Sequence, residues 1–385
     1  MRRPVPFRWL VLAAILVASV GLMGVETTKA DVWVIFPDDS INDAIDAASP
    51  GDTIILAEGT YYEEVLAFNK SNITVKGANS NVVIRPSAAE EGSAGPAAES
   101  PCEVPTGICV YTSSDVTFKQ ITVSGFSVGV GVILGVSTRI EDIRALDNVI
   151  GGIVVYQSIA TTLYRNVTNN DSSDISRFGI LAIDTLRSEI RLNRTEHSAI
   201  GIAVADSSDA AVLSNTARYN CAGIAFLEVV SSSINNNTSH NNTFACITSF
   251  EDIFDAGATL AGEQPADAAD TPVYYNISGT GIFVAASENI EVKGNSLTGN
   301  RGYPFSDTPG YVTIPSGGIV AMAFDDDNNI SLTISANFLR RNDVDINFVD
   351  ADNVPYVSTG TQNRCRSSVQ SIPSGYCNFG LTPSP

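Results

Sequence analysis

Three side chains in the middle of the chain have the types and the spacing that acid–base chemistry requires. Glu196, Arg218 and His240 follow one another at intervals of 22 residues. If the chain repeats with that period, they stack in one row, in which a carboxylate base lies beside a cationic partner. The alternative is a surface ion pair next to a solvated histidine, which contributes only about 0–1 kcal/mol to stability. The spacing is compatible with both interpretations.

A second group of side chains could hold a metal ion. Asp325, Asp326 and Asp327 are consecutive, and two asparagines follow them. Clustered oxygen ligands suit calcium, although the run does not have the spacing of an EF-hand loop. The alternative is a solvated acidic turn. Calcium is therefore the one cofactor that the sequence suggests, and no cofactor is certain.

A repeat in the chain would position these residues. Six units open with Gly-Ile, and several of them are separated by 22 residues. A fixed period of this length is typical of a solenoid. Small or apolar residues alternate after the glycine, which indicates a short strand with one buried face. The six units begin at Gly107, Gly179, Gly201, Gly223, Gly281 and Gly318.

An asparagine recurs 14 residues after the glycine of many units. Asparagine tolerates left-handed turn geometry, and its amide can bond the asparagine of the next coil. One coil thus contains three short strands and three turns, and like residues stack roughly 4.7–4.9 Å apart. The recurring asparagines are Asn166, Asn193, Asn215, Asn237 and Asn295.

A 22-residue coil with an asparagine ladder resembles the right-handed parallel β-helix of the pectate-lyase-like superfamily, over about residues 52–347. The runs GIFVAASENIEVKGN and IPSGGIVAMAF also resemble an uncharacterised group of exported bacterial tandem β-helix proteins. The resemblance implies an all-β solenoid with an N-terminal helical cap. It implies no particular reaction, because one scaffold of this kind supports many functions.

The chain divides into four predicted parts. The start is basic and then apolar up to Val25, as in a secretory signal peptide. Ser40 begins a helix whose apolar face would cover the open first coil. Ala245-Cys246-Ile247 is interpreted as the start of an extra coil between Gly223 and Gly281. The parts are a signal peptide (1–30), a cap helix (31–51), a β-helix with insertions near 87–106, 251–279 and 301–317 (52–349), and an irregular disulfide-bearing tail (350–385).

Charge and cysteines indicate export and exclude some partners. Removing residues 1–30 takes away four basic groups and one acidic group, so the net charge changes from −20 to −23. Such a surface disfavours nucleic acid, and it repels polyuronates unless a cation bridges them. No later stretch is long and apolar enough to span a membrane. Six cysteines in an exported chain favour disulfides with 15 connectivities, of which we adopt Cys102–Cys109, Cys221–Cys246 and Cys365–Cys377.

The outward positions of the Gly-Ile strands form a strip without charge. A large apolar strip is normally covered or is an interface. We expect the insertions or the C-terminal tail to cover it, and the alternatives are a partner-binding surface or a sugar-stacking groove. In the last case Tyr156, Phe283 and Tyr303 would contact the substrate. The strip residues are Val154, Tyr156, Leu181, Ile183, Ala203, Ala205, Ala225, Leu227, Phe283, Ala285, Val320 and Met322.

Two function classes follow. The first is a secreted, periplasmic or cell-surface protein that binds polysaccharide or another envelope component. The second is a polysaccharide lyase, hydrolase or epimerase, with calcium as a helper, although the Asp-Pro-His-Asp motif of mannuronan epimerases and the Gly-His-Gly motif of polygalacturonases are absent. A third idea is periplasmic metal delivery, as in the β-helix proteins that mature nitrous oxide reductase. Two histidines and the lack of a Cys–Met cluster disfavour it. The oligomeric state is not predicted.

Overall fold

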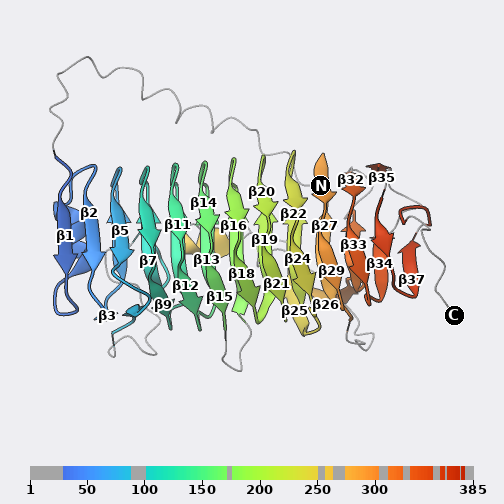
Figure 1. Ribbon diagram of the computed structural model, residues 1–385, viewed down its shortest axis with the longest axis horizontal. Helices are drawn as coiled ribbons and strands as arrows, with labels where there is room; N and C mark the ends of the chain where they lie inside the picture. The colour runs from blue at the N-terminus through green and yellow to red at the C-terminus, as the bar shows by residue number, and fades with distance from the viewer. Residues whose placement is uncertain are drawn as a thin grey trace, which may run out of the picture.

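The computed structural model describes residues 29–87, 101–170, 176–249, 256–262, 274–302, 311–323, 330–349, 356–359, 362–372 and 374–377. Three long parallel sheets, called A, B and C below, run along the molecule from its N-terminal to its C-terminal end (Figure 1). The predicted parallel β-helix is confirmed. The predicted signal peptide lies almost entirely outside the described residues.

Each sheet receives one strand from almost every coil. Sheet A contains β1 (Val32–Ile35), β2 (Thr53–Leu56), β5 (Thr74–Gly77), β8 (Thr117–Lys119), β11 (Arg139–Glu141), β14 (Thr162–Tyr164), β17 (Glu189–Arg191), β20 (Ala211–Leu213), β23 (Ser233–Asn235), β28 (Ile290–Lys293), β32 (Ile330–Ser335) and β35 (Tyr356–Thr359). Sheet B contains β3 (Gly59–Tyr62), β6 (Val82–Arg85), β9 (Thr122–Ser124), β12 (Arg144–Leu146), β15 (Val167–Asn169), β18 (Arg194–Glu196), β21 (Thr216–Arg218), β24 (Thr238–His240), β29 (Ser296–Thr298), β33 (Phe338–Arg340) and β36 (Arg364–Cys365). Sheet C contains β4 (Val65–Phe68), β7 (Thr106–Tyr111), β10 (Val128–Ile133), β13 (Gly151–Tyr156), β16 (Ser176–Ile183), β19 (Ser198–Ala205), β22 (Ala222–Leu227), β27 (Thr280–Ala285), β31 (Gly317–Met322), β34 (Val344–Val349) and β37 (Val369–Ile372).

The interior of the solenoid is a continuous apolar core. The isoleucine of each Gly-Ile unit points inward, and Ile180, Ile202 and Ile224 stack on neighbouring strands of sheet C without solvent exposure. Ile190 and Val212 do the same on sheet A. Strand alternation therefore places every second residue inside, and the residues between them face outward.

An asparagine ladder lines one inner corner. Its rungs run from Asn166 to Asn363, and each side-chain amide donates to the Oδ1 of the next rung at 3.0–3.1 Å. The left-handed backbone lies one residue earlier than the asparagine, for example at Leu192 (φ 57°) and Ser214 (φ 55°). The expectation that asparagine serves the turn geometry is therefore wrong at these positions. Asparagine is needed at these positions because its side-chain amide forms hydrogen bonds inside the buried corner.

The N-terminal end carries the predicted helix. α1 (Ile41–Ala47) begins at Ser40, whose hydroxyl accepts a hydrogen bond from the Asp43 N–H at 3.2 Å. Ile41, Ala44 and Ile45 are buried, so the apolar face of the helix covers the core as expected. Strand β1 precedes the helix and adds to sheet A, which the sequence did not indicate.

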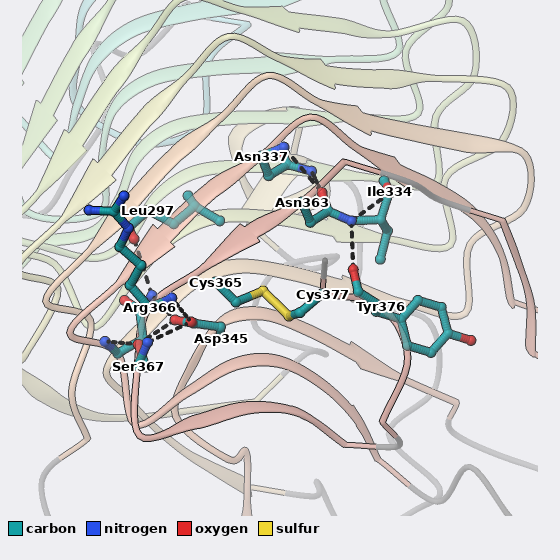
Figure 2. The surroundings of a disulfide bond; sticks show 11 residues. Leu297, Ile334, Asn337, Asp345, Asn363, Cys365, Arg366, Ser367, Tyr376 and Cys377 are labelled. Atoms are coloured by element: carbon teal, nitrogen blue, oxygen red, sulfur yellow. Dashed lines mark hydrogen bonds between the residues drawn. A yellow bond between two sulfur atoms is a disulfide. The ribbon is translucent and has the colours of Figure 1, made fainter. Parts of the chain in front are cut away.

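The C-terminal segment differs from the expected irregular tail. Strands β35, β36 and β37 pair with sheets A, B and C in turn, so the described part of the tail forms one more coil. Asn363 ends the asparagine ladder and donates to the Tyr376 carbonyl at 3.0 Å, beside the Cys365–Cys377 disulfide (Figure 2). Buried Asp345 accepts hydrogen bonds from the N–H groups of Arg366 and Ser367 at 2.9 Å. These contacts satisfy the polar groups of the last coil.

The excursion after β24 does not contain an extra coil. Strand β22 pairs directly with β27, and β23 and β24 complete the coil between them, so only the segment after β24 leaves the solenoid. Ala245-Cys246-Ile247 instead belongs to β25 (Ala245–Ser249), which pairs antiparallel with β26 (Tyr274–Ser278). β26 pairs in parallel with β30 (Tyr311–Thr313), and the three strands form a small separate sheet. The interpretation as a solenoid coil is wrong because the strand pairs antiparallel outside sheet C.

Candidate functional site

The structure brings Glu196, Arg218 and His240 together in one row. In sheet B, Glu196 of β18 is in register with Arg218 of β21, and Arg218 is in register with His240 of β24. Their inward neighbours Thr195, Ala217 and Ser239 are buried, so the row lies on the outer face. The 22-residue spacing thus placed these three residues correctly on neighbouring coils.

Glu196 is held by two arginines. Its Oε1 accepts hydrogen bonds from Arg194 Nε at 2.6 Å and from Arg218 Nε. Burial by itself would raise the pKa of the carboxyl, but the hydrogen bonds and charges of both guanidinium groups outweigh it and lower the pKa. Glu196 is therefore ionised and fully engaged at neutral pH, which makes it a poor proton acceptor.

His240 is neutral at physiological pH. Burial, followed by the charge of Arg218, lowers the pKa of its imidazole, and the Glu196 carboxylate only partly opposes this. The ring meets Tyr219 edge-on, with centroids 6.2 Å apart. His240 therefore belongs to an aromatic group as much as to the charged row.

The second histidine lies in the same neighbourhood, which the sequence analysis missed. His197 stacks on Tyr219 with centroids 6.0 Å apart, and it also contacts Phe244. Its Nδ1 is 2.7 Å from Asn169 Oδ1. The signal was available, because His197 and Tyr219 immediately follow Glu196 and Arg218 and share their 22-residue spacing.

A second group of cations lies where strands of sheet A turn into strands of sheet B. We call residues 139–146, 162–169, 189–196 and 211–218 the arginine corner. It contains six arginines and four carboxylates, and it has no lysine or histidine. The arginines are Arg139, Arg144, Arg165, Arg191, Arg194 and Arg218, and the carboxylates are Glu141, Asp142, Glu189 and Glu196.

An aromatic ring lies at the centre of the arginine corner. Tyr164 has the guanidinium carbons of Arg191 and Arg165 at 4.4 and 4.5 Å from its ring centroid. Arg165 also pairs with Asp142 at 2.6 Å and with Glu141 at 3.0 Å. Sequence reasoning did not find this group, because its members come from different positions of the repeat.

The apolar strip on the outer face of sheet C is a second hydrophobic core. All twelve predicted strip residues belong to one buried cluster. Residues from the insertions complete this cluster, including Leu260 of a short helix (256–260), Ile277 of β26 and Ile314. The helix and the small sheet, together with residues 101–104, form what we call the cover. The expectation that the insertions cover the strip is confirmed, whereas the described part of the tail extends the solenoid instead.

The cover lies in close contact with the strip. A Cβ on Gly257 would be only 2.5 Å from Tyr156 Cδ2, so only glycine fits at this point of the helix. The Glu103 N–H donates to the Leu260 carbonyl at 3.1 Å, which joins the two insertions. The adopted disulfides are all confirmed, and Cys102–Cys109 and Cys221–Cys246 both tie the cover to sheet C.

The predicted sugar-stacking residues do not form a groove in the described part of the chain. Tyr156 and Phe283 are 7% and 2% exposed, because the cover lies on them. Buried rings of this kind are packing residues and offer no face to a sugar. Tyr303 lies outside the described residues.

No metal site emerges from the residues that the structure describes. Among them, no three His, Cys, Asp or Glu side chains converge closely enough to hold an ion. Asp325, Asp326 and Asp327 lie outside the described residues, so the calcium prediction for this turn is not tested. A helix long and apolar enough to cross a membrane is likewise not found within the described ranges.

Comparison with protein families adds an assignment. The family model described as "Periplasmic copper-binding protein (NosD)" matches residues 45–245 and 167–369, which together cover most of the chain. The chain belongs to the NosD family. Metal delivery was the least favoured of the three functions predicted from the sequence, and the family match is a reason to consider it again. No curated protein matches the chain in sequence.

Solved structures agree on the fold. The Dettilon tailspike protein has a TM-score of 0.52 at 14% identity, and the match covers 90% of this chain and 70% of that one. The DFA-IIIase from Arthrobacter chlorophenolicus A6, solved without its lid in complex with GF2, has a TM-score of 0.51 at 13% identity, and the match covers 89% of this chain and 94% of that one. At such identities the likeness concerns the β-helix alone.

Proposed function

We propose that this protein is an exported β-helix that binds polysaccharide, or another component of the cell envelope, without modifying it. The observation that carries the proposal is the contrast between the faces of the solenoid. The outer face of sheet C is buried under the cover, whereas sheets A and B present exposed polar rows with guanidinium groups on tyrosine rings. Such a surface can bind a long ligand on several neighbouring coils.

The charged row supports binding rather than catalysis. A lyase or an epimerase needs a base that is free to accept a proton. Glu196 already accepts hydrogen bonds from Arg194 and Arg218, and its pKa is lowered. His240 is neutral, but burial and the charge of Arg218 lower its pKa and so make it a weaker base, and its ring meets Tyr219 edge-on. In our proposal the row therefore stabilises the ligand-binding face.

Export is supported by the cysteines. All six are paired, and disulfides persist in oxidising compartments such as the periplasm and the cell surface. The relatives of the matching family are described as periplasmic. We therefore place the protein in the periplasm, on the cell surface or outside the cell.

Copper binding is the second candidate, because the family description names it. Copper prefers cysteine, methionine and histidine ligands. The chain has six cysteines, all in disulfides, and three methionines, of which Met322 is buried under the cover. His197 and His240 come from the coils before and after that of Tyr219, and each ring contacts Tyr219. The residues present do not fit a copper site, and we assign this chain no copper chemistry.

A screen for binding and turnover tests the proposal. The purified protein would be mixed with neutral and acidic polysaccharides, either with calcium or with a chelator. Co-sedimentation would report binding, while new reducing ends and unsaturated ends would report turnover. We expect binding without product. Calcium-dependent product would instead support the polysaccharide lyase, hydrolase or epimerase alternative, with the turn at Asp325–Asp327 as the first place to mutate. Titration with copper ions, followed by absorption and EPR spectra, would test the second candidate.

A further inference from the structure

We infer that the ligand is an acidic polysaccharide and that it binds at the arginine corner. This inference rests on the proposed function and names the ligand class and the site. Its starting point is a charge imbalance. The molecule is strongly acidic, with 42 acidic and 22 basic side chains, yet the arginine corner has six arginines and four carboxylates.

The local surplus of positive charge is effective at short range. At physiological ionic strength, exposed charges are largely screened beyond about 8–10 Å. Carboxylates on distant coils therefore contribute little to the field at the corner. Lys119 of β8 continues the patch, because it is in register with Glu141 on one side and with Lys76 on the other. Lys76 and Lys119 thus lie on sheet A next to the arginine corner.

The cations at the corner are accessible. Arg165 and Arg194 side chains are 48% and 47% exposed. Arg144 is exposed, and among the described residues it has no ion-pair partner. It is in register with Val167, which is in register with Arg194, so the two guanidinium groups lie two coils apart, roughly 9–10 Å. A row of anionic groups on a flexible chain could contact both of them.

The guanidinium groups are also pre-positioned. Arg165 and Arg191 both pack against the Tyr164 ring, and the guanidinium carbon of Arg218 lies 5.2 Å from the Tyr219 ring centroid. Stacked arginines lose less freedom when they bind a carboxylate, because their planar forks are already oriented. The Tyr164 ring adds an aromatic group beside these guanidinium groups. Carboxylate-bearing sugars match this combination better than neutral ones.

Binding of polygalacturonate and of its fully methyl-esterified form would test the inference, with chelator present so that no cation bridges. The two polymers share a backbone and differ in charge. We expect the acidic form to bind and the affinity to fall as sodium chloride is raised. The double variant Arg144→Gln/Arg165→Gln should weaken binding about tenfold. The matched control Arg340→Gln/Arg364→Gln removes the same charge from exposed positions at the C-terminal end of sheet B and should change binding less than about twofold.

The outcomes separate the inference from the proposed function. Equal binding of both polymers, or binding of neutral polysaccharides alone, would overturn the acidic-ligand inference and leave polysaccharide binding intact. An equal loss of affinity in both double variants would mean that the ligand does not bind at the arginine corner. Binding of a DNA duplex at least as tight as that of polygalacturonate would overturn the ligand class. If none of the polysaccharides tested binds, the proposed function fails together with the inference.

Discussion

At the scale of single residues, neighbours decide what each polar group can do. Glu196 has the type and the spacing of a catalytic base, but Arg194 and Arg218 both donate to it. Arg194 lies on the same strand, two residues away, and Arg218 comes from the next coil. A carboxylate between two guanidinium groups forms a structural ion pair that anchors neighbouring coils, and it does not act as a catalytic base.

The substitution Glu196→Gln should lower the free energy of unfolding by about 1–2 kcal/mol at pH 7, because two charge-assisted hydrogen bonds are weakened. The folded-state pKa of Glu196 is lowered from 4.5. The stabilisation is therefore present above pH 4.5 and is lost as the pH falls through the folded-state pKa. Urea unfolding of both proteins from pH 7 to pH 3 would measure the difference, which should shrink at the acidic end.

Glu291→Gln provides the control, because Glu291 forms a more exposed pair with Lys293 at 3.9 Å. It should change the stability by no more than about 1 kcal/mol. Equal effects of the two substitutions would contradict the anchoring role of Glu196.

The titration of His240 gives a second prediction at this scale. Burial and the charge of Arg218 lower its pKa below 6.5, so the folded state takes up the proton at a lower pH than the unfolded chain does. With only two histidines in the chain, NMR can follow both imidazoles, and His197→Asn assigns the signals. We expect the His240 midpoint below 6.5. A midpoint above 6.5 would mean that Glu196 dominates over burial.

At the scale of elements, the asparagine ladder holds successive coils in register. The Oδ1 of Asn215 accepts from the main-chain N–H of Asn193 at 2.8 Å and from its side-chain amide at 3.0 Å. The Asn215 amide donates to the Ile190 carbonyl at 2.8 Å and to Asn237 at 3.0 Å. All of these groups are buried, so each rung serves the coils on both sides.

Asn215→Ala should lower the free energy of unfolding by about 2–4 kcal/mol, because buried donors and an acceptor lose their partners. Thr216→Ala is the control, since Thr216 is the next residue and its side chain points outward. It should cost less than about 1 kcal/mol. Chemical denaturation would measure both, and a similar small loss in each case would rule out a cooperative role for the ladder.

At the scale of the whole molecule, the cover turns one face of the solenoid into an interior. Sheet C therefore has a core on each side, one inside the solenoid and one under the cover. In the part of the chain that the structure describes, sheets A and B keep long outer faces with exposed side chains. This division of the surface is what directs the proposed binding to the arginine corner.

Leu260→Ala should loosen the cover, because Leu260 is fully buried and lies against Gly131 of sheet C. Removing this side chain should cost about 2 kcal/mol or more. We expect increased binding of a hydrophobic dye and faster proteolysis near the helix, while the far-ultraviolet spectrum of the solenoid stays unchanged. Leu192→Ala, at a 49% exposed turn residue, should increase neither dye binding nor proteolysis. Identical dye binding by both variants would argue against a cover that protects the strip.

The repeat fold and the row on sheet B could be predicted from the sequence alone. The Gly-Ile period, the asparagines and the inward isoleucines predicted the β-helix, and the same period placed Glu196, Arg218 and His240 on neighbouring coils. Periodicity suffices here because each coil contacts only its neighbours, so residues with the same repeat position must stack. The strip on sheet C was recognised as apolar for the same reason.

Only the tertiary structure decided what lies on and between those repeats. It showed that β25 leaves the solenoid, that the last residues form another coil, and that the cover buries Tyr156 and Phe283. It also brought the guanidinium groups of Arg165 and Arg191 against the Tyr164 ring. Insertions carry no repeat, and contacts between different repeat positions depend on where side chains point in space. A period along the chain cannot specify either.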